Sequence, residues 1–283
     1  MPVNYTIKYK SENNYENPVH EAYWQFLVTP ENNDSQELLS SNFNTSVDAR
    51  IENSINGYNF ETARIHCKKP FDKIKFEAEF RLLKKETNPF EFIPTTDNNS
   101  DYKLIESLLF KVDFESFLKE TNLTKLPANQ KDVYTFNKEL SIFDNLKALN
   151  NWIYIQLYFK TGVTHVDTLL EEIIENRHGV CQDFSHLFCA IARRNQIPTR
   201  YVSGYLHQGE GFFGDSQMHA WVEAFVPNNG WIGFDPTNNL LVNHNHIKIS
   251  HGIDYNDCAP LKGVIYSSGK NETNYSVEVS YQQ

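Results

Sequence analysis

Alternating apolar and polar residues mark the first third of the chain as strands. The clearest run is residues 74–82, where five apolar residues alternate with four charged ones. Shorter alternating runs surround Tyr5 and Trp24. Because successive side chains of a strand point to opposite faces, this pattern is typical of an antiparallel sheet with one face in a core and one in water. We therefore predict a β-rich domain over residues 1–83.

The pattern then changes from strands to helices. Residues 84–100 contain prolines and several polar residues, and we predict that they form a linker. Apolar residues recur every three or four positions after this segment, most regularly between Leu140 and Ile153, which predicts a long helix. Thr168 and Glu171 have the spacing of a capping box. We predict an α+β protein in which residues 101–283 form a second domain, with helices packed on an antiparallel sheet.

Cys181 stands at the start of a further predicted helix. It follows Gly179 closely, and four apolar residues after it have the spacing of one helix face: Phe184, Leu187, Phe188 and Ile191. At the other end, Asn195 can adopt a left-handed cap conformation and Pro198 prevents continuation. The free N–H groups of a first turn favour a thiolate and could hold an oxyanion. The plain alternative is a buried, inert cysteine.

A histidine and an aspartate follow on what we predict to be a hairpin. Residues 218–226 read as a strand, and Pro227-Asn228-Asn229-Gly230 has turn chemistry. A type I turn closed by a left-handed Gly230 would place Val226 opposite Gly230. Asp235 would then lie diagonally beside His219 on one face, where its carboxylate can orient the imidazole. A structural, hydrogen-bonded histidine is the alternative.

Residues from about Trp152 to Tyr266 resemble the transglutaminase-like superfamily, a papain-like cysteine fold, in its bacterial branch. The motifs that carry the resemblance are Arg177-His178-Gly179-Val180-Cys181-Gln182-Asp183-Phe184, Pro198-Thr199-Arg200-Tyr201-Val202-Ser203-Gly204-Tyr205, His219-Ala220-Trp221-Val222-Glu223, Gly230-Trp231-Ile232-Gly233-Phe234-Asp235-Pro236-Thr237-Asn238 and Asp254-Tyr255-Asn256-Asp257. The resemblance implies a catalytic triad of Cys181 as nucleophile, His219 as general base and acid, and Asp235 as its orienter. It also implies acyl transfer at a peptide or glutamine-type amide through a thioester.

The chain departs from the family pattern in two places. The family usually has a glycine before the Ile-Pro pair, and this chain has Asn195-Gln196 there. Asparagine tolerates the same backbone conformation. The family's Gly-Arg-Asp-Tyr segment appears as Gly252-Ile253-Asp254-Tyr255, which removes an arginine charge. We therefore leave Asp254 and Tyr255 out of the expected catalytic set.

Three further side chains are candidates for binding substrate or oxyanion. Gln182 follows the nucleophile directly, and Trp221 shares the predicted strand face of His219. Trp152 lies on the predicted long helix. An indole N–H from Trp221 or Trp152 could supplement backbone donors at an oxyanion. The alternative for both tryptophans is aromatic packing around the cleft.

A metal site is the main chemical alternative. Its candidate ligands are His244, His246, His251 and Cys258, because imidazole and thiolate together can bind zinc. Their spacing matches no standard zinc module, and the aspartate-rich calcium loop pattern is absent from the sequence. We therefore expect neither a metal nor another cofactor.

The composition of the chain narrows the classes of binding partner that we expect. The 283 residues carry a formal net charge of −10, which argues against nucleic acid or an anionic membrane as partner. No apolar run approaches the roughly 20 residues of a membrane helix. The first residues show no secretory signal, and the four cysteines at 67, 181, 189 and 258 show no paired spacing. We expect a cytoplasmic protein with a peptide or protein substrate, and inert packing for Cys67, Cys189 and Cys258.

The sequence leaves the reaction partly open. The prediction is a cysteine-dependent enzyme that acts on amides through a thioester on Cys181, with hydrolysis preferred over transamidation. The alternatives are an amine-accepting protein cross-linker and a non-catalytic peptide-binding module that retains the triad, because a fold hosts more than one function.

Overall fold

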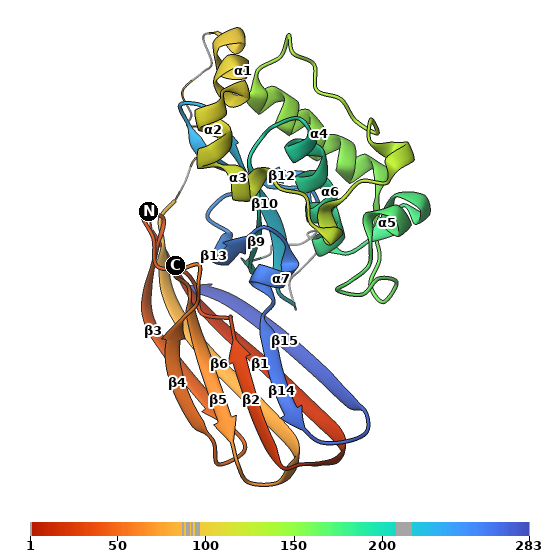
Figure 1. Cartoon of the computed structure of the whole chain (residues 1–283). Helices are drawn as coiled ribbons and strands as arrows, with labels where there is room; N and C mark the ends of the chain where they lie inside the picture. The colour runs from red at the N-terminus through yellow and green to blue at the C-terminus, as the bar shows by residue number, and fades with distance from the viewer. Residues whose placement is uncertain are drawn as a thin grey trace.

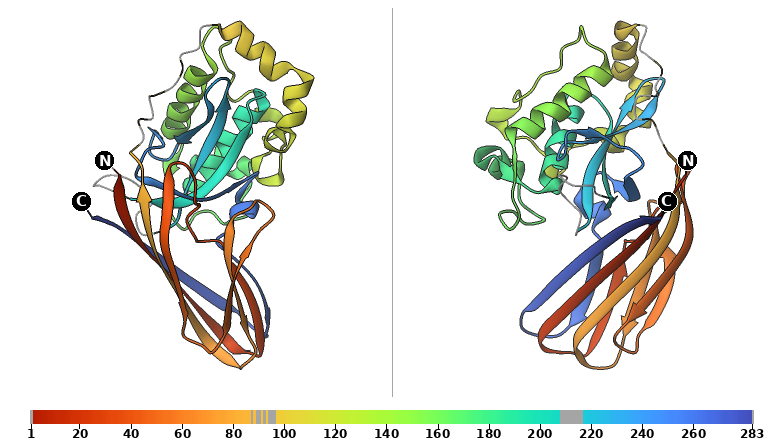
Figure 2. Two further views of the ribbon diagram at one scale, coloured as in Figure 1. Left: turned by 90° about the vertical axis from the view of Figure 1, so that its left-hand side faces the viewer. Right: turned by 180° about the vertical axis from the view of Figure 1, so that it is seen from behind.

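The computed structural model describes residues 2–86, 88, 91, 93, 97–207 and 217–282. It consists of an elongated β sandwich and a mixed part in which helices surround a sheet (Figure 1). Both chain ends lie in the sandwich, at the end next to the helical part (Figure 2). Antiparallel pairing of Asn4 with Gln282 brings these ends together.

Two four-stranded antiparallel sheets form the sandwich, in the orders β15-β1-β6-β3 and β14-β2-β5-β4. The strands are β1 (Val3–Val19), β2 (Glu21–Phe26), β3 (Gln36–Thr45), β4 (Arg50–Ile55), β5 (Glu61–Cys67), β6 (Phe71–Lys84), β14 (Leu261–Tyr266) and β15 (Asn271–Gln282). The alternation predicted for residues 74–82 is confirmed, because all five apolar residues are buried. Phe76 of β6 stacks on Phe26 of β2 with ring centroids 3.8 Å apart, which joins the two sheets.

The last two strands return to the sandwich. β15 pairs with β1 along twelve residues, and β14 pairs with β2. Residues 261–282 therefore lie with the N-terminal strands, which corrects the expected second domain that ran to residue 283. Pairing between opposite ends of a chain leaves no local signal in the sequence. The expected linker over residues 84–100 is shorter at both ends, since Lys84 lies in β6 and a helix begins at Asn98. Several residues between them lie outside the described ones.

Helices make up most of the other part. They are α1 (Asn98–Glu106), α2 (Leu108–Asp113), α3 (Glu115–Leu118), α4 (Ile142–Gln156), α5 (Leu170–Asn176), α6 (Cys181–Arg194) and α7 (Tyr255–Cys258), with the 3₁₀ turns η1 (Asn122–Thr124) and η2 (Ala128–Gln130). The predicted long helix is α4. The capping box at Thr168 is wrong, because Leu169 is the N-cap of α5 and Thr168 accepts the N–H of His165. Within the described residues, no helix is long and apolar enough to cross a membrane.

A five-stranded antiparallel sheet with the order β12-β11-β10-β9-β13 lies against these helices. Its strands are β9 (Thr199–Leu206), β10 (His219–Val226), β11 (Gly230–Asp235), β12 (Leu240–Leu241) and β13 (His246–Gly252), and a parallel pair, β7 (Tyr158–Phe159) and β8 (His178–Gly179), lies apart from it. Helix α6 packs on β10 through a core that includes Ala220, Val222 and Ala224. Because side chains alternate along a strand, Trp221 and Glu223 of β10 point to the other face of the sheet.

The hairpin of β10 and β11 has the predicted register. Val226 pairs with Gly230 and Val222 with Phe234. Gly230 has the expected positive φ of 75°. The turn is not the expected type I, because Asn228 has a φ of 63° where type I requires a negative value.

The end of α6 also differs from the prediction. Gln196, with a φ of 63°, takes the left-handed conformation expected for Asn195, whose φ is −85°. The Asn195 side chain instead donates to the carbonyl of Ile191 and accepts the N–H of Phe136. This side chain therefore closes the helix by hydrogen bonding, and its own backbone need not turn.

The sheet and the sandwich share a core. Tyr205 of β9 and Ile247 and Ile249 of β13 are buried in the hydrophobic cluster of the sandwich. The hydroxyl of Tyr205 donates to the carbonyl of Val28 at 2.6 Å. Strands β9 and β13 are therefore in contact both with the sandwich and with helices of the other part.

Candidate active site

The turn before Cys181 is fixed by Asp183. Its Oδ2 accepts the N–H of Val180 and the hydroxyl of Thr164, both at 2.8 Å. A Cβ on Gly179 would lie 2.5 Å from the same oxygen, so only glycine fits there. Burial raises the pKa of Asp183 to about 6, although both hydrogen bonds oppose this. Cys181 is thereby held as the first residue of α6, as predicted.

Cys181 differs from the other cysteines in exposure. Its side chain is partly exposed, whereas Cys67, Cys189 and Cys258 are buried. Burial raises the pKa of Cys189 to about 11 and that of Cys258 to about 12, so both thiols stay protonated at neutral pH. Cys181 is therefore the partly exposed thiol among the four cysteines.

His219 and Asp235 form a buried pair at the end of the β10–β11 hairpin, near the start of α6. His219 begins β10, Asp235 ends β11, and the Nε2 of His219 lies 2.8 Å from the Oδ2 of Asp235. Both side chains are fully buried. The hairpin register predicted this proximity, since Asp235 follows Phe234, the partner of Val222.

Electrostatics favour a charged His219. Burial lowers its pKa, but the Asp235 carboxylate and the Cys181 thiol more than offset burial and raise it to about 10. Burial opposes ionisation of Asp235 too, and His219 holds its pKa well below the ordinary value. The Nδ1 of His219 has no hydrogen-bond partner among the described residues. With Nε2 engaged by Asp235, Nδ1 is the nitrogen left for the nearby Cys181 thiol, which contributes to the raised pKa of His219.

The carboxylate of Asp235 contacts several groups besides His219. Its Oδ1 accepts the backbone N–H groups of Thr237 and Asn238, which closes a turn on its own main chain. Its Oδ2 accepts the Asn238 amide at 2.8 Å and also contacts the Nε2 of His246 at 3.2 Å. His246 is the residue of the site that sequence reasoning assigned elsewhere.

The metal site expected as an alternative is not assembled. His251 contacts the Arg200 guanidinium, and the Cys258 thiol faces the carbonyl of Tyr201. His246 lies instead against Asp235. Among the described residues, the group with ligand spacing is His219, Asp235 and His246, whose atoms are already bonded to one another.

The three oxyanion candidates have different surroundings. The Gln182 amide donates to the carbonyl of Val166 at 3.0 Å, which turns it away from an oxyanion role. Trp221 lies beside His219 with ring centroids 6.2 Å apart, and its Nε1 is buried without a partner among the described residues. Trp152 packs on Tyr134 with centroids 5.2 Å apart. Trp221 therefore keeps an available donor next to the site.

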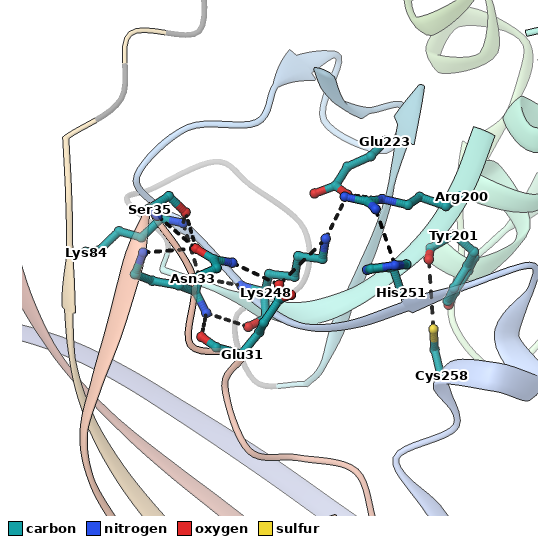
Figure 3. A network of polar contacts seen from close by, with 11 residues as sticks. Glu31, Asn33, Ser35, Lys84, Arg200, Tyr201, Glu223, Lys248, His251 and Cys258 are labelled. Carbon is teal, nitrogen blue, oxygen red and sulfur yellow. Dashed lines mark hydrogen bonds and ion pairs between the residues drawn. The ribbon is translucent and has the colours of Figure 1, made fainter. Parts of the chain in front are cut away.

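A polar network joins Glu31 and Lys84, from the sandwich part of the chain, to Lys248, Glu223 and Arg200 of the five-stranded sheet (Figure 3). Glu223 accepts hydrogen bonds from Arg200 at 2.5 Å and Lys248 at 2.8 Å, and these cations lower its pKa to about 2 against the effect of burial. The network borders a cleft of about 550 Å³ lined by both parts of the chain, including Lys84 and Trp231. The Arg200 guanidinium lies 4.3 Å above the Trp231 ring. This network is therefore ordered by charge pairs.

Ile253 stands where the family has an arginine, and its backbone is hydrogen-bonded to two charged side chains. The carbonyl of Ile253 accepts the guanidinium of the buried Arg193 at 2.6 Å, and its N–H donates to Asp257. Asp254 caps α7 by accepting the N–H of Asn256, and the N–H of Tyr255 donates to the Nε2 of His186. Both Asp254 and Tyr255 thus have local structural partners.

Comparisons with known proteins agree with this architecture. Residues 131–236, which span Cys181, His219 and Asp235, match the model of the Transglutaminase-like superfamily. An uncharacterized protein of Mycobacterium leprae (strain TN) is 26% identical over 273 residues, which cover 94% of each chain. A protein-glutamine gamma-glutamyltransferase of Pseudomonas aeruginosa is 34% identical over 83 residues, 27% of this chain and 12% of that protein.

One similar solved structure covers the sandwich as well. The crystal structure of a candidate cysteine protease from Cytophaga hutchinsonii superposes with a TM-score of 0.76 at 21% identity. The match covers 100% of this chain and 92% of that chain. The whole two-part fold, including the returning C-terminal strands, is therefore shared.

Proposed function

We propose that the chain, whose residues 131–236 match the model of the transglutaminase-like superfamily, is a cysteine-dependent acyl-transfer enzyme with Cys181 as nucleophile, His219 as general base and acid, and Asp235 as orienter. One observation carries the proposal. A fully buried His219–Asp235 pair lies beside the accessible thiol at the start of α6. A nucleophile, a base within reach of it and a third group that orients the base are the parts that this chemistry requires.

Because His219 is held as an imidazolium, the thiol proton already lies on this ring, and the reaction begins when the Cys181 sulfur attacks the amide carbon as a thiolate. The carbonyl oxygen becomes an oxyanion, which N–H groups at the start of α6 can stabilise, with the Trp221 indole as a further candidate donor. His219 then returns the proton to the departing amine or ammonia, which leaves a thioester on Cys181. The Asp235 carboxylate stabilises the imidazolium in between.

We place hydrolysis ahead of cross-linking as the second half-reaction. Water attacks the thioester, His219 accepts its proton, and the carboxylic acid and the thiol are released. The partial exposure of Cys181 supports this order, because water reaches the sulfur unless a bound amine displaces it. Side chains and backbone donors fill every role, so the proposed reaction needs no metal.

The test is a library of glutamine-containing peptides incubated with the protein and EDTA, with and without a primary amine. Ammonia release or peptide cleavage that is lost in Cys181→Ala supports hydrolysis. Efficient incorporation of the amine would assign cross-linking instead. Activity that is lost on chelation and restored by calcium or zinc would overturn the metal-free mechanism.

A further inference from the structure

His246 occupies a place that the proposed triad leaves unexplained. It is the first residue of β13, its side chain is fully buried, and its Nε2 lies 3.2 Å from the Oδ2 of Asp235. That oxygen is the one that contacts the Nε2 of His219. Two imidazoles therefore share one carboxylate oxygen.

Hydrogen bonding fixes the tautomer of His246. The ionised Asp235 carboxylate can only accept, which requires the proton on the Nε2 that contacts it. The backbone N–H of Asn243 then donates to Nδ1 at 3.3 Å, and the Asn243 Oδ1 lies farther from this nitrogen, at 3.4 Å. The proton of a neutral ring then lies on Nε2, where it is donated to Asp235. Burial lowers the pKa of His246 in spite of the carboxylate, which keeps the ring neutral. His246 thus acts as a neutral donor to the carboxylate that pairs with charged His219.

The ring is held in place by groups outside the triad. Trp221 packs edge-on against it, with centroids 5.3 Å apart and an interplanar angle of 77°. Two residues along β13, the backbone of Lys248 is clamped by the Gln36 side chain of the sandwich, which donates to its carbonyl at 2.7 Å and accepts its N–H at 3.0 Å. The sandwich therefore helps to fix the strand that carries His246.

We propose that His246 is a positioning residue: its Nε2–H anchors the Oδ2 of Asp235, so that the carboxylate keeps His219 aimed at Cys181. The proposal rests on the proposed function and extends the triad to a fourth member supplied by β13. Its effect on Cys181 passes through Asp235 and His219. Loss of this donor leaves Asn238 as the other side-chain donor to Oδ2 besides His219, so the carboxylate is held less firmly and the alignment of His219 is relaxed.

Two variants of His246 separate positioning from simple packing. The amide of His246→Gln reaches close to the position of Nε2, whereas the amide of His246→Asn is one methylene short of Asp235. The same pair of substitutions at His251 is the control, because His251 lies on the same strand and contacts Arg200 instead of the triad. Thermal unfolding and circular dichroism establish that each full-length variant is folded.

The measurement is the rate of Cys181 alkylation by iodoacetamide between pH 5 and 10, followed by mass spectrometry. In the native protein we expect Cys181 to be alkylated readily already at pH 6. His246→Asn should lower the rate at pH 6 about tenfold or more, while His246→Gln recovers most of the rate. Both His251 variants should match the native profile.

The outcomes separate the two proposals. If His246→Asn and His246→Gln are folded and give the native profile, or fall equally, His246 does not position Asp235 and the triad alone stands. If native Cys181 is alkylated at pH 6 no faster than the buried Cys189 and Cys258, the activated nucleophile of the proposed function fails, and the positioning role falls with it.

Discussion

The Nε2 of His219 lies 2.8 Å from the Oδ2 of Asp235, and both side chains are closed off from solvent. A buried carboxylate needs a partner, and a buried imidazole beside it is held in one tautomer. This pair directs the other ring nitrogen toward the thiol of Cys181.

Asp235→Asn should lower the rate of acyl transfer on the order of 10³- to 10⁴-fold. The asparagine amide can donate to Nε2, which would leave the proton on Nδ1, where it cannot accept the thiol proton. Asp254→Asn is the matched control, because Asp254 is also buried but only caps α7, a role that asparagine can fill. Hydrolysis of an activated ester measures the rate. Equal rates for the two variants would contradict the assignment of Asp235.

Cys181 should react with iodoacetamide much faster than the other three cysteines near neutral pH. Its side chain is partly exposed, whereas burial raises the pKa of Cys189 and Cys258 far above neutrality. Peptide mapping over time measures each site, with Cys181→Ala as the blank. Labelling of all four cysteines at one rate would speak against a thiolate at Cys181.

Asp183 should make the folded state less stable as pH rises from about 4 to above 6. Its pKa is raised by burial to about 6, so the folded protein holds a proton that the unfolded chain releases near pH 3.8. The stabilisation is complete below the unfolded value and is lost as pH rises through 6. Asp183→Asn should flatten this dependence.

The size of the Asp183 effect is on the order of 1–3 kcal/mol. It is measured as the difference in unfolding free energy between the native protein and Asp183→Asn by urea denaturation at several pH values. Other carboxylates such as Glu223 titrate in both proteins and cancel in the difference. A difference independent of pH would refute the raised pKa.

Gly204→Ala should destabilise the protein by about 1–3 kcal/mol or more. Gly204 pairs with His219, and a Cβ there would lie 2.3 Å from both the carbonyl oxygen of Ile247 and the Trp221 ring. Gly57→Ala is the control, since its Cβ would meet nothing within 4 Å. Thermal unfolding measures both. A harmless Gly204→Ala would disprove the close packing of β9, β10 and β13.

The parts of the site that are local in sequence could be predicted. The spacing after Cys181 marks a helix, and the turn ending in Gly230 fixes the register that brings Asp235 to His219. Both depend on interactions between residues that are close along the chain, where periodicity and turn chemistry act.

The remaining features depend on long-range contacts. His246 lies in a polar stretch that reads as a solvated loop, and nothing local reveals that β13 carries it against Asp235. The return of β14 and β15 to the sandwich likewise joins the two ends of the chain. The type of the hairpin turn and the end of α6 were predicted wrongly for a local reason. Asn228 and Gln196 adopt a positive φ, and no glycine at these positions signals it.

The most direct test of the central claim is a pre-steady-state reaction with p-nitrophenyl acetate, an activated acyl donor that requires no knowledge of the natural substrate. The account predicts a burst of p-nitrophenolate equal to the enzyme concentration, an acetyl group on Cys181 by mass spectrometry, and a greatly reduced burst in Asp235→Asn but not in Asp254→Asn. A burst of the same size from Cys181→Ala, or acetylation of lysines with none on Cys181, would contradict acyl transfer through this thiol.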